Sequence, residues 1–574
     1  MKNFKPLILI RKLFHKYLNL DLSNFDEEGR LHISQPYLAR LISYQIQQKV
    51  NKNVFPGYLN SFAVLTGLFN YIMKKFDDEL SPNSLKSASN YLRVQLSDEE
   101  FENLTGEFFR NFPDKTFLLH PEKLGSIKEQ FESDAFKEAF IRNLILTFLS
   151  NQNRAAEDLK FIFDDEDLVH NSKYIHSIKI LEQYFDKIRI EPLRNKSLIE
   201  FLFEPIQVSP ESLEGQLNFI KENWKEIIPD EIFSQILKAI DLIKEDEKIF
   251  QTGFGPGETK VPTFSIEELL GFGDKFKGAF YPITPIEEEK FTPDTDWMPE
   301  VVLLAKNIYV WLYQLSKKYN RDLKRLDQIP DEELDLLASF GFNALWLIGI
   351  WERSPASRKI KQLSGNPEAL ASAYSIYDYV IASDLGGEEA FQNLNDRCLI
   401  RGIRLACDIV PNHMGIYSRW IIEHPDYFIQ TDYSPFPAYS FTGPDLSEHP
   451  DYQIRIEDKY WTRQDAAVIF QLIENKTGKV RYIYHGNDGT NMPWNDTAQL
   501  NLLKPEVREA LYQLILNIAR KFSIIRLDAA MTLTQKHYQR LWYPVPGLGG
   551  AIPSRTDFSM STEEFLEKYP KEFW

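Results

Sequence analysis

Apolar residues at helical spacing dominate the first 250 residues of the chain. Residues 36–50 (PYLARLISYQIQQKV) and 58–76 each repeat apolar positions three and four apart, and residues 211–245 form two such segments that divide near Pro229. Apolar residues at this spacing share one face of a helix and bury it against a core. The pattern predicts a mostly α-helical domain over residues 1–250.

The composition changes abruptly after this region. Residues 251–264 contain three glycines and two prolines, and the residues that follow, to about 297, are rich in proline and glutamate. Glycine and proline interrupt both helices and strands. We therefore expect a linker and lead-in over residues 251–297, and a second domain from residue 298 to residue 574.

From about Trp297 short apolar runs alternate with helical patterns, which is typical of a parallel α/β sheet. The pattern predicts a first strand at residues 307–313 and a helix at 330–340 that ends at Gly341. A second strand is expected at 343–350, and a helix at 388–399 precedes a third strand.

A long aromatic-rich segment follows the third strand and leads to the clearest helix in the chain. Residues 414–500 lack a regular pattern, and a segment of that length inside a compact domain is expected to form a subdomain or a functional cover. Residues 505–522 carry one apolar stripe and begin at Pro505, which suits the first helical position. A short buried strand at residues 523–527 should follow.

Charged and polar residues occur at the ends of two of these apolar strands. Arg526 and Asp528 are two apart and share one strand face, while Asp408, Asn412 and His413 lie within and just past the third strand. Taken alone, Arg526 and Asp528 fit a structural ion pair. Polar groups at the carboxyl ends of several parallel strands instead favour the active face of a (β/α) barrel.

The two motifs Asp408-x-x-x-Asn412-His413 and Arg526-x-Asp528 resemble, in this order, the first and second signature regions of the α-amylase superfamily (glycoside hydrolase family 13). The resemblance covers residues 297–574, about half of the chain. It implies a (β/α)8-type barrel of which only the first half is present, with residues 414–500 as the subdomain that the family inserts after the third strand. The helical domain at 1–250 resembles no family we can name.

The resemblance implies a role for each matched residue in a retaining mechanism with a covalent glycosyl intermediate. Asp528 is the candidate nucleophile, and Arg526 on the same strand face would orient it and favour its ionised form. His413 could hydrogen-bond a sugar hydroxyl through a neutral imidazole. Tyr374 matches the tyrosine that stacks on the sugar being cleaved, and Asp408 supports the site through hydrogen bonds. A structural role remains the alternative for His413 and Tyr374.

Three tryptophans and a metal position extend this picture. Trp351, Trp420 and Trp494 are candidates for lining sugar subsites, with core packing as the alternative. Asn412 corresponds to a position that ligates calcium in many family members. The second family ligand, an aspartate, is replaced here by Gln499 in residues 497–501. Losing that charge weakens a hard-cation site, so the sequence does not predict a filled calcium site, and the reaction requires no cofactor.

The general acid of the family, a glutamate at the end of the fifth strand, has no counterpart in this sequence. Glu563 and Glu564 fit better as the opening of a helix, in a capping pattern that begins at Ser561. Residues 571–574 should continue that helix. Four strands alone would leave an open sheet edge, so we expect the sequence to be the N-terminal part of a longer enzyme.

Bulk properties limit the classes of function. The net charge of -17 argues against nucleic-acid or anionic-membrane partners, and two cysteines provide neither a disulfide framework nor a cysteine-based zinc site. No membrane span is recognisable, and we expect a cytoplasmic protein. The favoured hypothesis is a hydrolase or glucanotransferase acting on α-glucans or maltooligosaccharides. The alternatives are a glycan-binding protein without activity, or half of a split enzyme completed by a C-terminal portion or a second polypeptide.

Overall fold

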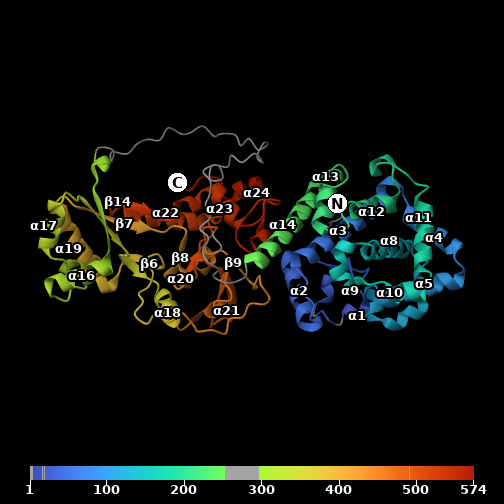
Figure 1. Cartoon of the computed structure of the whole chain (residues 1–574), viewed down its shortest axis with the longest axis horizontal. Helices are drawn as coiled ribbons and strands as arrows, with labels where there is room; N and C mark the ends of the chain where they lie inside the picture. The colour runs from blue at the N-terminus through green and yellow to red at the C-terminus, as the bar shows by residue number, and fades with distance from the viewer. Residues whose placement is uncertain (1–3, 16, 19, 253–296, 490–491) are drawn as a thin grey trace. The chain divides into compact units, whose positions relative to one another are not determined.

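The computed structural model describes residues 4–15, 17–18, 20–252, 297–489 and 492–574, and the chain forms two compact units (Figure 1). The first unit contains Met1–Gln251, Ser434–Tyr439 and Gln539–Phe565. The second contains Thr252–Tyr433, Ser440–Tyr538 and Leu566–Trp574. Residues 253–296 of the predicted linker lie outside the described residues.

Helices make up most of residues 4–252, as predicted. The expected helix at 36–50 is found with those bounds, and the expected division near Pro229 separates α13 from α14. A two-stranded antiparallel sheet joins β1 (Leu7–Leu9) to β2 (Arg30–His32). The helices are α1 (Lys12–His15), α2 (Pro36–Val50), α3 (Pro56–Lys75), α4 (Ser84–Gln95), α5 (Asp98–Asn111), α6 (Lys115–Leu119), α7 (Ile127–Gln130), α8 (Asp134–Asn151), α9 (Lys160–Phe163), α10 (Glu166–Asn171), α11 (Tyr174–Phe185), α12 (Leu198–Val208), α13 (Leu213–Asn223) and α14 (Asp230–Thr252).

Helix α3 lies at the centre of the first unit. Its residues are buried on nearly every side, and it contacts α2, α8, α13 and β1. A helix that is apolar around its whole circumference is stable only inside a core. Aromatic side chains fill the surrounding space: Phe69 of α3 lies against Trp224, and Trp224 stacks on Phe201 at a ring-centroid distance of 4.5 Å.

Residues 539–565, although late in the sequence, complete the first unit. Carboxylates of α14 accept hydrogen bonds from the backbone of this segment, Asp241 from Gly547 N at 2.7 Å and Glu245 from Ser554 N at 2.7 Å. Arg40 of α2 donates to Asp557 of the same segment at 2.7 Å. The helical unit therefore binds a segment of the region expected to form only the barrel.

A four-stranded parallel sheet organises the second unit, in the order β14-β7-β4-β3. The strands are β3 (Leu303–Asn307), β4 (Ala344–Ile348), β7 (Arg404–Ile409) and β14 (Ile524–Leu527). The first strand was expected at 307–313, and this is wrong, because helix α16 begins at Ile308. Asn307 caps that helix through its side chain, which accepts a hydrogen bond from Val310 N.

Helices connect the strands of this sheet. The predicted helices at 330–340 and 388–399 are confirmed as α17 and α19, and Arg397 of α19 binds Asp331 of α17. A separate antiparallel pair, β5 with β6, lies in the connection between β4 and β7. The elements are α16 (Ile308–Tyr319), α17 (Asp331–Ser339), β5 (Trp351–Arg353), α18 (Pro355–Leu363), β6 (Ile376–Ile381), α19 (Gly387–Ile400) and α22 (Pro505–Ala519).

The segment after β7 contains its own small sheets. Four antiparallel strands pair in the order β10-β11-β12-β9, and β13 pairs with β8. The aromatic-rich sequence of this region therefore forms ordered strands. The elements are β8 (His413–Gly415), α20 (Arg419–Glu423), β9 (Gln430–Thr431), β10 (Tyr452–Ile456), α21 (Asp458–Trp461), β11 (Ile469–Glu474), β12 (Lys479–Tyr484) and β13 (Thr497–Gln499).

Strand β14 differs from the expected buried strand, because Arg526 and Leu527 are exposed. In the described residues β14 pairs only with β7, so it is an edge strand of the sheet. It is followed by the 3-10 helix η11 (Ala530–Leu533), α23 (Gln535–Trp542), the 3-10 helix η12 (Arg555–Phe558) and α24 (Thr562–Lys568).

The end of the chain confirms one prediction and corrects another. The Ser561 hydroxyl accepts a hydrogen bond from Glu564 N at 3.1 Å, which is the predicted helix cap. The expected helical continuation over 571–574 is wrong, since α24 ends at Lys568 and Pro570 disfavours helix in the residue before it. None of the helices in the described residues has the length and apolar character needed to cross a membrane.

Candidate functional site

Arg526 joins two carboxylates at the carboxyl ends of neighbouring parallel strands. The register of the sheet places Arg526 of β14 opposite Asp408 of β7. The guanidinium donates from Nη1 to Asp408 Oδ1 at 2.9 Å and from Nη2 to Asp528 Oδ1 at 2.7 Å. Sequence reasoning placed Arg526 and Asp528 on one strand face, and their shared contact agrees with that placement. One cation thus orients two carboxylates that lie 120 positions apart along the chain, as their numbers show.

Asp408 is the buried member of this group, with 4% of its side chain exposed. Trp346 Nε1 donates to its Oδ2 at 3.0 Å, so both carboxylate oxygens are hydrogen-bonded. Burial raises the pKa of Asp408 above its ordinary value, and the hydrogen bonds from Arg526 and Trp346 oppose that rise. A buried carboxylate with both oxygens occupied is suited to hold its neighbours rather than to react.

Asp528 is more accessible, with 25% of its side chain exposed. Its backbone N donates to Ile409 O of β7 at 2.8 Å, which continues the strand pairing by one residue. Asp528 Oδ1 accepts from Arg526, and in the described part of the chain its other carboxylate oxygen accepts no hydrogen bond. A partly exposed, oriented carboxylate next to a cation has the geometry of a nucleophile.

His413 and Tyr374 lie beside this group and contact each other. His413 Nε2 lies 3.2 Å from Tyr374 O, and the centroid of its ring is 5.0 Å from that of Trp494. His413 is buried, and this burial lowers its pKa to about 4. The imidazole is therefore neutral at physiological pH. The Tyr374 ring lies 5.8 Å from the guanidinium carbon of Arg526, which brings the tyrosine to the same group.

Asn412 is fully buried and faces Gln499 rather than the solvent. Gln499 Nε2 donates to both oxygens of Asn412, the backbone O and Oδ1, at 3.0 Å each. Gln499 Oε1 in turn accepts from Asn412 Nδ2 at 3.2 Å. Among the described residues no group of three or more His, Cys, Asp or Glu side chains is placed to hold a metal ion. Asn412 O and Oδ1, the oxygens that calcium would use here, both accept hydrogen bonds from the amide nitrogen of Gln499, so this arrangement does not fit a calcium ion.

The tryptophans divide differently from the sequence-based expectation. Trp351 and Trp420 are buried, so the expectation that they line subsites is wrong for these two. Trp351 Nε1 instead donates to Asp408 O at 2.7 Å, which supports the strand from within the core. Trp494 is half-buried against His413. Sequence reasoning missed Trp346, although its place in an apolar strand next to the strand of Asp408 was a usable signal.

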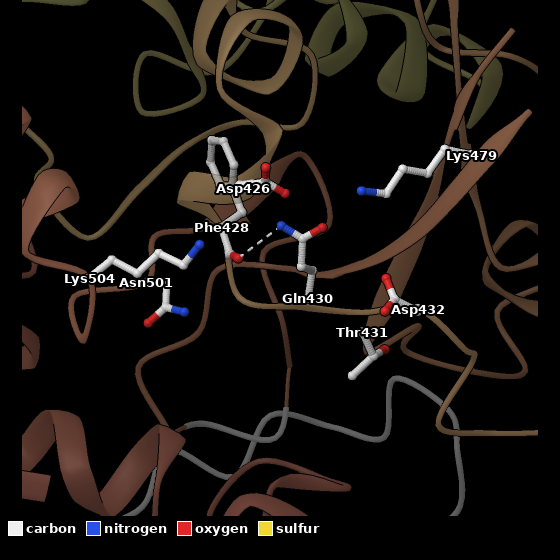
Figure 2. Close-up of a pocket in the computed structure, with 8 residues that line it drawn as sticks. All are labelled: Asp426, Phe428, Gln430, Thr431, Asp432, Lys479, Asn501 and Lys504. Atoms are coloured by element: carbon white, nitrogen blue, oxygen red, sulfur yellow. Dashed lines mark hydrogen bonds between the residues drawn. The ribbon is translucent and has the colours of Figure 1, made fainter. Parts of the chain in front are cut away.

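A separate polar cavity of about 300 Å³ lies in the inserted segment and is shown in Figure 2. Two carboxylates and two lysines line it, and Gln430 Nε2 donates a hydrogen bond to Phe428 O within this lining. It shares no lining residue with the group around Arg526. Its lining residues are Asp426, Phe428, Gln430, Thr431, Asp432, Lys479, Asn501 and Lys504.

A segment that contains Asp408, Arg526 and Asp528 matches a known protein family. Residues 327–543 match the family model described as the alpha-amylase catalytic domain. Similar solved structures include an alpha-amylase from Lactobacillus plantarum, with 17% identity, 42% of this chain and 40% of that chain covered, and a TM-score of 0.25. A noncanonic maltogenic alpha-amylase from Thermotoga neapolitana has 15% identity and a TM-score of 0.24, and the match covers 40% of this chain and 38% of that chain. A trehalose-6-phosphate hydrolase from Bacillus licheniformis has 17% identity and a TM-score of 0.27, and the match covers 48% of this chain and 43% of that chain. This chain spans about two fifths of the length of these structures.

Proposed function

Because residues 327–543 belong to the α-amylase family, we propose that this chain provides the nucleophile half of a site that cleaves or transfers α-glucosidic bonds. The substrate class is an α-glucan or maltooligosaccharide, and the reaction is a retaining double displacement. Hydrolysis and transfer differ in whether water or a sugar hydroxyl reaches the intermediate, and both remain within the proposal.

The observation that supports this proposal is the double hydrogen bond of Arg526 to Asp408 and Asp528. A carboxylate can attack an anomeric carbon only when it is ionised and held in line with the breaking bond. Arg526 meets the second condition for Asp528, since its planar fork donates to Oδ1 and fixes its position. Asp408 fixes Arg526 in turn, and Trp346 fixes Asp408.

The proposed chemistry uses these groups in two steps. Asp528 attacks the anomeric carbon, a bond forms between its carboxylate oxygen and that carbon, and the glycosidic C–O bond breaks. The leaving oxygen keeps the electron pair and takes a proton from the general acid. Water or a sugar hydroxyl then attacks the same carbon and gives its proton to the general acid, which lost one in the first step. The bond between that carbon and Asp528 breaks, and its electron pair returns to the carboxylate.

The sugar would be held by Tyr374 and His413. The aromatic face of Tyr374 suits the C–H face of a pyranose. His413 is buried, so it would bind a sugar hydroxyl only by exchanging its contact with Tyr374 O for that hydroxyl. Trp494 packs beside His413 and limits the motion of its ring. We keep Tyr374 and His413 as sugar-binding residues and assign no proton transfer to either of them.

The general acid is assigned to no described residue. Glu563 and Glu564 open helix α24, and Glu564 N is bound by Ser561. We propose instead that further strands pair with the free edge of β14 and bring a glutamate to the site. A continuation of this chain or a second polypeptide could supply these strands, since either can pair with an edge strand.

A substrate with a reactive leaving group tests the nucleophile without the general acid. Fluoride leaves a glycosyl fluoride without strong acid assistance, so 5-fluoro-α-D-glucosyl fluoride should transfer its sugar to Asp528 as the C–F bond breaks. Intact-mass analysis of the 574-residue protein should show one added sugar, and peptide mapping should place it on Asp528. Asp528→Asn should abolish the adduct, whereas the control Glu563→Gln should retain it.

The same experiment separates the alternatives. An adduct on a different carboxylate, or normal labelling of Asp528→Asn, would refute the assignment. Saturable binding of maltooligosaccharides by calorimetry, with no adduct under any condition, would favour a glycan-binding protein without activity. Labelling that appears only after a second polypeptide is added would favour a split enzyme.

A further inference from the structure

Asn412 and Gln499 form a reciprocal pair in the core of the second unit. Gln499 Nε2 lies 3.0 Å from both Asn412 O and Asn412 Oδ1, so the two oxygens converge on one nitrogen. In the opposite direction, Gln499 Oε1 accepts from Asn412 Nδ2 at 3.2 Å and from Asn487 N at 3.4 Å. Both side chains are fully buried, and each of their amide oxygens and nitrogens has a hydrogen-bond partner.

Convergent oxygens are the requirement for a hard cation such as calcium, which takes six to eight oxygen ligands at 2.3–2.6 Å, roughly. Here the point of convergence is occupied by an N–H donor, which repels a cation instead of binding it. Thr532 adds to the same cluster, since its Oγ1 lies 3.0 Å from Asn412 Oδ1 and is itself buried. No carboxylate takes part in these contacts.

We propose that the carboxamide of Gln499 takes the place of a cation and forms a metal-independent clasp. The clasp joins three parts of the chain: the turn after β7 through Asn412, strand β13 through Gln499, and η11 through Thr532. An N–H group and a cation can both attract two oxygens, but only the N–H group does so without an ion from solution.

The clasp lies close in sequence to two predicted site residues, His413 and Asp528. His413 follows Asn412 directly, and its Nδ1 lies 3.3 Å from Asn412 Nδ2. Thr532 lies four residues after Asp528, at the start of the segment that follows β14. Asn412, held by Gln499, is therefore also tied through Thr532 to η11, the segment that follows β14. The inference uses the proposed function only to name these neighbours, and its test measures stability, so it can fail while the nucleophile assignment stands.

The experiment compares the thermal unfolding of the second unit in EDTA and in about 5 mM CaCl2, a concentration above the dissociation constants of most protein calcium sites. The wild-type protein should unfold at the same temperature in both. Gln499→Glu keeps the length of the side chain but replaces the donor with an oxygen that faces two oxygens. It should lower the Tm by about 5 °C or more. The control Gln471→Glu, on a half-buried residue of β11, should change the Tm by less than that.

Two results would overturn the proposal. One is saturable calcium binding by the wild-type protein in a calorimetric titration that Asn412→Ala abolishes. The other is a Tm loss for Gln499→Glu no larger than that for Gln471→Glu. The calcium titration needs only the wild-type protein and the Asn412 variant, so the proposal stays falsifiable if Gln499→Glu fails to fold.

Discussion

The indole Nε1 of Trp346 donates a hydrogen bond to Oδ2 of Asp408 at 3.0 Å, from one strand of the parallel sheet to the next. The Trp346 ring also lies 5.1 Å from the guanidinium carbon of Arg526, close enough for a cation–π contact. Trp346 thus touches both groups that support Asp528 in the proposed mechanism. It is a positioning residue, because it acts on Asp528 only through Asp408 and Arg526.

Trp346→Phe should slow the labelling of Asp528 by the glycosyl fluoride about tenfold, because one hydrogen bond to a charged group contributes about 1.5–3 kcal/mol. The phenyl ring would still cover Arg526, so the protein should remain folded. The control is Trp311→Phe, which makes the same substitution at a tryptophan whose Nε1 has no hydrogen-bond partner in the described part of the chain; Trp311 is buried, whereas Trp346 is half-buried. Equal labelling rates in the two variants would contradict the positioning role.

Arg526→Lys should reduce the same labelling rate by about a hundredfold or more, since an ammonium group cannot bind two carboxylates with the planar fork of a guanidinium. Mass spectrometry over a time course measures the rate. Arg419→Lys serves as the control, because Arg419 binds Asp378 at 2.7 Å at a half-exposed position outside the group. A rate for Arg526→Lys within a few-fold of the wild type would show that the bridge is dispensable.

The stability of the second unit should rise with pH between about 4 and 6.5 because of His413. Burial lowers the pKa of His413 to about 4, from an ordinary value of 6.5. In this range the unfolded chain binds a proton that the folded chain does not, so protonation favours unfolding. The contribution is about 3 kcal/mol, fully present above pH 6.5 and lost as the pH falls to 4.

Replacing His413 tests that pH dependence. His413→Gln should reduce the slope of the plot of Tm against pH between 4 and 6.5; the slope that remains includes the contribution of His485, whose pKa burial lowers to about 3. His120→Gln, at an exposed position of the helical unit, should leave the slope unchanged. The slope is the relevant measurement, since either variant can shift the whole curve. An unchanged slope in His413→Gln would mean that other groups produce the pH dependence.

In the helical unit, Asp246 should destabilise the fold as the pH rises. Burial raises the pKa of Asp246 to about 7, and Gly57 N donates to its carboxylate at 2.5 Å. Glu245 and Glu247 add negative charge, and Arg40 is the nearby cation that opposes them. The folded state therefore binds a proton that the unfolded state releases, and the associated stability is lost as the pH rises from about 4 to 7.

Asp246→Asn removes the charge and keeps an oxygen for Gly57 N. It should raise the Tm of the helical unit by several degrees at pH 8 and by much less at pH 5. Glu247→Gln, at an exposed position of the same helix, is the control and should show no such difference between the two pH values. A larger gain at pH 5 than at pH 8 would reverse the predicted sign.

Local sequence patterns determined much of the secondary structure. The stripe of apolar residues from Val507 to Ile518 lies within α22, and the two-residue spacing of Arg526 and Asp528 placed them on one face of β14. These features depend on neighbours a few positions away, so the periodicity alone is informative. The start of α16 was missed because residues 308–313 are apolar at nearly every position, a run that fits either a strand or a helix.

Tertiary structure decided the features that depend on distant partners. The sequence by itself determined that Asp408, His413, Arg526 and Asp528 could meet at strand ends, because parallel strands bring their carboxyl ends to one edge. Only the folded chain showed that Trp346 donates a hydrogen bond to Asp408, that residues 539–565 pack with the helical unit, and that Gln499 donates to both oxygens of Asn412. A hydrogen bond between residues 87 positions apart leaves no periodic trace in the sequence, since its geometry is set by how whole elements pack.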